Sequence, residues 1–79
     1  MMEAGFILES GDGKILRRAL SWDETRTLTA AHFFTADQAL RVIKGSQGWE
    51  RKPTLKTPVA YDRETGKVTR AGEPEAVRI

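Results

Sequence analysis

The sequence predicts a small α+β domain: an antiparallel β-sheet of four to five strands with one α-helix packed on one face. Short strand-like runs are joined by glycine-containing turns at residues 10–13 and 62–66. One run with the spacing of an amphipathic helix lies between them, at residues 36–43. The chain of 79 residues is short enough to form a single domain, residues 1–79.

The first predicted hairpin covers residues 4–20. Residues 4–10 (AGFILES) are largely apolar and run into the turn sequence Gly11-Asp12-Gly13. An Asp-Gly pair between two strand-like runs favours a tight hairpin turn. The second strand is predicted over 14–20 (KILRRAL), where alternate side chains point to opposite faces and one face is left to solvent.

Residues 21–34 connect this hairpin to the helix. We expect 21–27 to be a polar loop that Trp22 pins to the core, and 28–34 to be a short strand or an extended lead-in. His32 is the only histidine of the chain, and no nucleophile with an adjacent oriented base is evident beside it. It is interpreted as a structural histidine near a strand end.

The helix is the best-specified element. Thr35 is its predicted N-cap, and Gln38, three residues later, completes a capping box. Gly45 stands where a glycine commonly ends a helix. A helix of about ten residues is marginal in isolation, so it must dock on the sheet. Its apolar face is predicted to consist of Ala36, Ala39, Leu40 and Ile43.

A second hairpin is predicted after the helix. Residues 54–61 are predicted to be a strand whose side chains alternate, with Leu55, Thr57, Val59 and Tyr61 on one side. A turn follows at 62–66, with glycine at the position that favours a positive φ. Residues 67–70 return as a short, charged edge strand. The tail, 71–79, is expected to be a loosely ordered segment.

We find no catalytic, metal-binding or cofactor site in the sequence. The chain has no cysteine, which excludes disulfides and thiolate metal sites, and its single histidine excludes a multi-histidine site. The carboxylates lie in predicted loops without the alternating spacing of a calcium loop. We therefore expect a non-enzymatic protein that acts by binding another molecule.

We expect a cytoplasmic protein that makes no membrane contact. No apolar run approaches the ~18 residues needed to cross a bilayer, and the first residues lack the pattern of a signal peptide. The absence of cysteine fits a reducing compartment. Because the core of so short a chain is thin, both a monomer and a homodimer are consistent with the sequence.

The basic residues are concentrated in one stretch. Residues 41–56 hold five of them and a single acid, Glu50, and Trp49 lies inside the stretch. A basic patch with an aromatic side chain is a reasonable anchor for a protein or nucleic-acid surface. The alternative is a solvated charged face with Trp49 tucked into the core. The predicted partner-binding residues are Arg17, Arg18, Trp49, Arg51, Lys52 and Lys56.

The order of several marks along residues 6–43 resembles short phage and prophage proteins. These marks are the opening strand Phe6-Ile7-Leu8, the turn Asp12-Gly13-Lys14, Trp22, and Phe34-Thr35 at the start of the helix. Some proteins with this layout are anti-CRISPR proteins. The resemblance implies an inhibitor that docks on a host defence complex, a type I Cascade, and sterically blocks target DNA binding.

Two other functions are open at this point. A weak nucleic-acid-binding module could use the same basic patch, and the net charge of +2 allows such contact without requiring it. A phage structural or assembly protein would instead form a defined oligomer. With so small a net charge, an inhibitor would occupy an acidic or mixed protein surface and would not imitate DNA.

Overall fold

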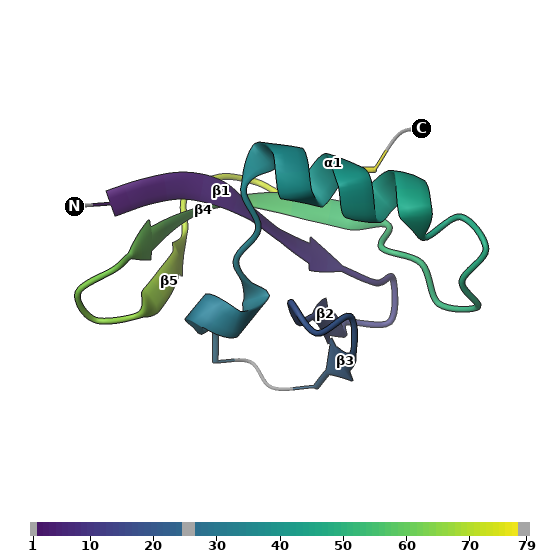
Figure 1. The fold of residues 1–79 in the computed structure, drawn as a ribbon, viewed down its shortest axis with the longest axis horizontal. Coiled ribbons are helices and arrows are strands. Elements are labelled where there is room, and N and C mark those ends of the chain that lie inside the picture. The colour runs from purple at the N-terminus through teal and green to yellow at the C-terminus, as the bar shows by residue number, and fades with distance from the viewer. Residues whose placement is uncertain (1, 25–26, 78–79) are drawn as a thin grey trace.

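A computed structural model describes residues 2–24 and 27–77 of the chain. It confirms the predicted class: an antiparallel sheet with one α-helix, α1, across one face (Figure 1). The strands lie in the order β3-β2-β1-β4-β5, and β6 pairs with β4. In chain order the elements are β1 (Met2–Glu9), β2 (Ile15–Leu16), β3 (Trp22–Asp23), the 3₁₀ turn η1 (Ala30–His32), α1 (Ala36–Gly45), β4 (Leu55–Asp62), β5 (Lys67–Arg70) and β6 (Glu75–Ala76).

The central ladder joins β1 to β4 along their full lengths, from Met2 opposite Asp62 to Glu9 opposite Leu55. Side chains of a strand alternate between the two faces of its sheet. The neighbours Ile7 and Leu8 therefore point to opposite faces, and both are fully buried. It follows that both faces of this sheet are covered.

The helix covers one face and encloses the first core. The amphipathic pattern of α1 turns Ala39 and Ile43 toward the sheet, where they are buried. Trp22 and Trp49 are half-buried and pack against this core, so Trp22 pins its segment as predicted. The buried members of the helix-side core are Leu8, Leu16, Phe34, Ala39 and Ile43.

The opposite face carries a second, smaller core under the segment that contains η1 (Figure 1). Phe33 is buried there, and its ring centroid lies 5.0 Å from that of Tyr61. Leu28 packs on the same cluster. The solvent-exposed face expected for residues 14–20 is also not found in β2, where the neighbours Ile15 and Leu16 are both buried. The buried members of this core are Ile7, Phe33, Val59 and Val68.

The turns and the helix start agree with the sequence patterns. Gly13 and Gly66 close the two predicted turns with φ of +86° and +71°, a backbone conformation that glycine adopts without steric cost. The Thr35 hydroxyl accepts the Gln38 N–H at 3.2 Å, and Gln38 Oε1 accepts the Thr35 N–H at 3.0 Å. The capping box is confirmed, and so is β5 over residues 67–70.

The predicted strand over 14–20 is wrong after its third residue. Only Ile15–Leu16 form β2, because the chain then turns back on itself. The Arg17 N–H donates to the Ser21 carbonyl and the Leu20 N–H donates to the Arg17 carbonyl, both at 2.8 Å. This turn brings Trp22–Asp23 alongside β2 as β3, in a segment predicted to be a loop.

The connection over 28–34 is also not a strand. It forms η1, and only single bridges at Thr29 and Phe34 join it to β5 and β1. His32 is therefore the last residue of a 3₁₀ turn and does not lie near a strand end. The local reason is a second capping box, in which Thr29 is the N-cap and His32 takes the place usual for Glu or Gln.

The helix differs from prediction at its last residue and on its apolar face. Gly45 is the last residue of α1, and Ser46 is its C-cap. Of the four residues predicted on the apolar face, Ala36 and Leu40 are exposed, and Val42 packs against the core instead. Within the tail predicted to be loosely ordered, β6 pairs with β4 through Leu55 opposite Ala76.

Candidate partner-binding groove

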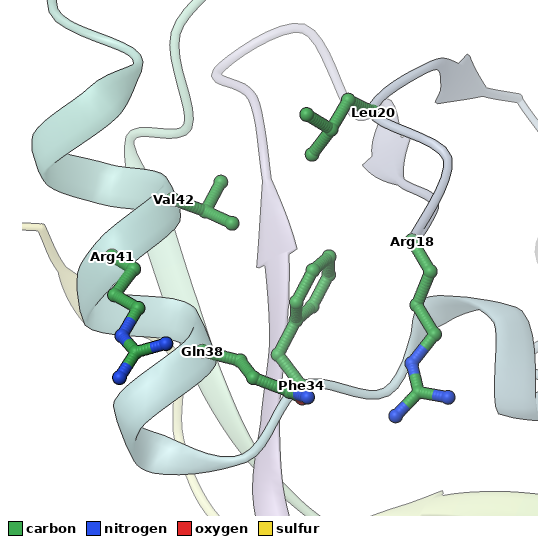
Figure 2. A pocket seen from close by; sticks show the side chains of 6 residues that line it. All are labelled: Arg18, Leu20, Phe34, Gln38, Arg41 and Val42. Atoms are coloured by element: carbon green, nitrogen blue, oxygen red, sulfur yellow. The ribbon is translucent and has the colours of Figure 1, made fainter.

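A groove of about 430 Å³ lies between α1 and the turn that joins β2 to β3 (Figure 2). One wall comes from the exposed side of α1, and the other comes from the turn. The floor is the residue that precedes the helix cap. Its lining side chains are Arg18, Leu20, Phe34, Gln38, Arg41 and Val42.

One end of the groove is apolar. The Phe34 ring forms the floor and is 3% exposed. Val42 is half-buried and points from α1 toward this ring, and Leu20 points toward it from the turn (Figure 2). Leu20 is 51% exposed, so this end presents an apolar surface to solvent.

The other end is polar and positively charged. The Arg18 backbone N–H donates to the Ala31 carbonyl at 2.7 Å, and its Nε donates to the Phe33 carbonyl at 3.1 Å. These two bonds hold the Arg18 side chain beside the groove. In Figure 2 the polar ends of Gln38 and Arg41 lie at the same end as the guanidinium of Arg18. Neither arginine has a carboxylate partner within 4.0 Å among residues 2–24 and 27–77.

This arrangement suits a ligand that carries a negative charge next to an apolar group. A guanidinium binds a carboxylate through charge-assisted hydrogen bonds, which are about twice as strong as neutral ones. The apolar end adds a favourable term for each apolar group that leaves water there. A short peptide segment with an acidic and an apolar side chain meets both requirements.

The six predicted binding residues do not form one surface. Arg17 belongs to the turn after β2 and lies 3.7 Å from the Asp23 carboxylate, whereas Arg18 lines the groove. Arg51 is 2.9 Å from the Asp12 carboxylate, and Lys52 lines a separate cleft beside it. The basic stretch after the helix is thus partly neutralised by the first hairpin turn.

Lys56 and Trp49 lie elsewhere. The Lys56 ammonium is 5.3 Å from the centroid of the Phe6 ring and 3.9 Å from the Glu75 carboxylate. Trp49 packs against the helix-side core, as the alternative interpretation of the basic patch requires. The sequence analysis did not predict the other groove residues as binding residues, because their meeting with Arg18 depends on a turn that the local pattern did not reveal. These residues are Leu20, Phe34, Gln38, Arg41 and Val42.

Two carboxylates beside the first hairpin, Asp12 and Glu24, make the stability of the fold depend on pH. The direction of this dependence follows from their lowered pKa values. The pKa of Asp12 is lowered by the hydrogen bond from the Ser10 hydroxyl and by the charge of Arg51. The pKa of Glu24 is lowered by its hydrogen bond with Lys14, 2.8 Å away. A carboxyl group with a lowered folded-state pKa stabilises the fold above its unfolded pKa.

We therefore expect these two carboxylates to contribute fully above their ordinary pKa values of 3.8 and 4.5, and to lose that contribution as the pH falls below them. The contribution of each exposed pair should be small and reduced by salt. Carboxyl NMR titration of the folded chain measures both pKa values. Arg51→Gln should move the Asp12 midpoint upward and that of Glu24 by less, because Lys14 is the main cause of the lowered pKa of Glu24. An Asp12 midpoint that is the same in the wild-type and Arg51→Gln proteins would contradict the contact between Arg51 and Asp12.

Both ring nitrogens of His32 have hydrogen-bond partners within the fold. Its Nδ1 accepts the Thr29 N–H at 3.2 Å, and its Nε2 lies 3.2 Å from the Asp23 carboxylate. The Thr29 hydroxyl is 3.4 Å from Nδ1, so the order of groups resembles a nucleophile, base and acid. The backbone N–H already occupies the lone pair that a base would need, and His32 is 1% exposed. The cluster joins β3 to η1.

Comparison with known proteins identifies no relative. No protein-family model, curated protein sequence or solved structure matches the chain. Within the described ranges, no cluster of three or more histidine, cysteine or acidic side chains could hold a metal ion. No helix there has the length and apolar character of a membrane span. The functional assignment therefore depends on the geometry of the groove.

Proposed function

We propose that this chain is a small binding protein that docks on an acidic segment of a partner protein through the groove between Arg18 and Arg41. One observation carries the proposal. Two arginine side chains without carboxylate partners in the described part of the chain line one groove whose floor is apolar. Unpaired guanidinium groups beside apolar surface favour a partner that supplies carboxylates next to an apolar side chain.

A protein partner fits this surface better than a nucleic acid does. Nucleic-acid grooves combine a track of positive charge with aromatic side chains that stack on bases. Here Trp22 and Trp49 pack against the core, and the exposed large apolar side chains of the described residues are not aromatic. Much of the positive charge is already in ion pairs: Lys14–Glu24, Arg17–Asp23, Arg51–Asp12, Lys56–Glu75, Arg63–Glu3 and Arg70–Glu9.

The proposal is tested by NMR titration of the ¹⁵N-labelled full chain with three probes. These are the acidic peptide acetyl-Gly-Glu-Leu-Glu-Gly-amide, its basic counterpart with lysine in place of glutamate, and a mixed-sequence single-stranded DNA. We expect the acidic peptide to shift the amide signals of Arg18, Leu20 and Arg41, and the basic peptide to leave them unchanged. Arg41→Glu should weaken the binding of the acidic peptide by about tenfold or more, because a charge-assisted hydrogen bond is replaced by repulsion between like charges.

Lys52→Glu is the matched control, since it makes the same change of charge at an exposed position that lines a different cleft. It should leave the affinity for the acidic peptide within about twofold, because Lys52 does not line the groove and salt screens the interaction between exposed charges. Equal losses in both variants would reject the groove in favour of the basic stretch. Tighter binding of the DNA, weakening steeply with salt, would replace the proposal by a nucleic-acid-binding function.

The biological setting is a separate part of the proposal and rests on the resemblance to anti-CRISPR proteins. In that setting the acidic segment belongs to a type I Cascade subunit, and the bound domain blocks access of target DNA. Expression of the chain in a host with an active type I system should then restore plaque formation by a targeted phage. Arg41→Glu should lose this effect. If expression of the chain leaves interference unchanged, the anti-CRISPR setting is rejected. The peptide titration still decides whether the groove binds an acidic segment.

A further inference from the structure

Leu20 has a backbone conformation that leucine rarely adopts. Its φ is +62°, and it is the one residue other than glycine with a positive φ among those that the structure describes. A side chain with a Cβ is disfavoured there, and turns of this kind usually place glycine or asparagine at the position. The sequence therefore retains a leucine where the backbone favours a residue without its side chain.

Packing within the fold explains little of this choice. The turn is closed by main-chain hydrogen bonds from Arg17 to Ser21 and from Leu20 to Arg17, which any residue could make. Half of the Leu20 surface remains in solvent. The side chain nevertheless reaches over the apolar end of the groove, toward Val42 and Phe34 (Figure 2). A sparsely populated backbone conformation kept at a binding surface is a recognised sign of a functional constraint.

We infer that Leu20 contacts the partner and selects an apolar side chain that adjoins the carboxylates bound at the basic end of the groove, where Arg18 and Arg41 lie. The inference rests on the proposed function and adds the chemistry of the recognised segment. Charge supplies the attraction at one end of the groove, and Leu20, Val42 and Phe34 read the neighbouring side chain at the other end.

The test compares the acidic leucine peptide with acetyl-Gly-Glu-Gly-Glu-Gly-amide, which keeps the charges and lacks the apolar side chain. The wild-type chain should bind the leucine peptide about threefold to tenfold more tightly, as expected for partial burial of one leucine. Leu20→Asn and Leu20→Gly should lose most of this preference, because only Phe34 and Val42 remain at the apolar end of the groove. Leu20→Met, which keeps an apolar side chain, should retain the preference.

Thermal unfolding of the same variants separates binding from packing. Because asparagine and glycine relieve the φ of residue 20, their Tm should be unchanged or higher. A fall of more than about 5 °C, roughly 1 kcal/mol for a domain of this size, would make Leu20 a packing residue and overturn the inference. Leu40→Gln is the matched control: Leu40 is 50% exposed and lines a different groove, so the preference should persist.

The two levels of the proposal fail in different ways. If the acidic leucine peptide binds no better than its lysine counterpart, the proposed function fails and the role of Leu20 falls with it. If acidic peptides bind and Leu20→Asn keeps the preference for leucine, the proposed function stands and the role of Leu20 is rejected.

Discussion

Replacing Gly5 by alanine is expected to lower the free energy of unfolding by about 3 kcal/mol, at the upper end of the range for overpacking. A Cβ added at Gly5 would meet the Phe33 ring and the Phe34 carbonyl oxygen well inside van der Waals contact. The carbonyl cannot turn away, because it accepts the Phe6 N–H at 2.8 Å. Glycine within a strand otherwise costs only roughly 0.5–1 kcal/mol relative to alanine, so the clash determines the sign.

Urea unfolding followed by tryptophan fluorescence measures this effect, since Trp22 and Trp49 both pack on the core. Gly45→Ala is the matched control. A Cβ at Gly45 has no atom within 4 Å, and the residue lies in the last turn of α1. Alanine there should stabilise the protein by about 0.5–1 kcal/mol. A Gly5→Ala protein as stable as the wild type would show that the segment Phe33–Phe34 does not cross β1 this closely at Gly5.

Replacing His32 by alanine is the second large effect, with an expected loss of about 3 kcal/mol. The ring is buried and joins two elements through the Thr29 N–H and the Asp23 carboxylate. Alanine removes both hydrogen bonds and leaves a cavity beside the second core. Asp23 would also keep its negative charge in a partly buried place without this donor.

A graded series shows which bond matters more. His32→Gln should recover part of the loss, because a glutamine oxygen can accept the N-cap N–H as Gln38 does at the start of α1. Asp23→Asn keeps an acceptor for His32 and should cost less than His32→Ala. Urea midpoints of the three variants give the order. If His32→Gln and His32→Ala were equally unstable, the capping bond would contribute nothing.

The elements that the sequence predicts well are those whose signals are local. Thr35 and Gln38 satisfy each other across three residues, and Gly13 and Gly66 meet a steric requirement of their own turns. Such interactions are complete within a few residues, so a pattern in the sequence is sufficient to place them. The strand β4 follows from alternation, and β1 and β5 follow from the runs that flank the two turns.

The elements that were mispredicted carry unusual residues at the positions that normally signal a turn or a helix cap. The chain turns after Arg17, but Leu20 stands at the position of the turn where glycine is usual. The sequence therefore lacks the usual signal for a turn. His32 replaces the expected Glu or Gln of a capping box, which hides η1. The groove combines both difficulties, because its walls meet only after the turn and α1 have docked on the same core. Of the predicted binding residues, only Arg18 lines it.

The ladder between β1 and β4 has a consequence for how the chain reaches its native state. The strand β1, at the middle of the sheet, is made before its full-length neighbour β4, which lies beyond α1 in the last third of the sequence. During synthesis, Ile7 and Leu8 therefore remain without β4, the strand that pairs with β1, until β4 has emerged. Pairings over such long separations slow folding and prolong the exposure of apolar side chains. Nascent chains that stop before residue 55 carry the central strand without the means to bury it.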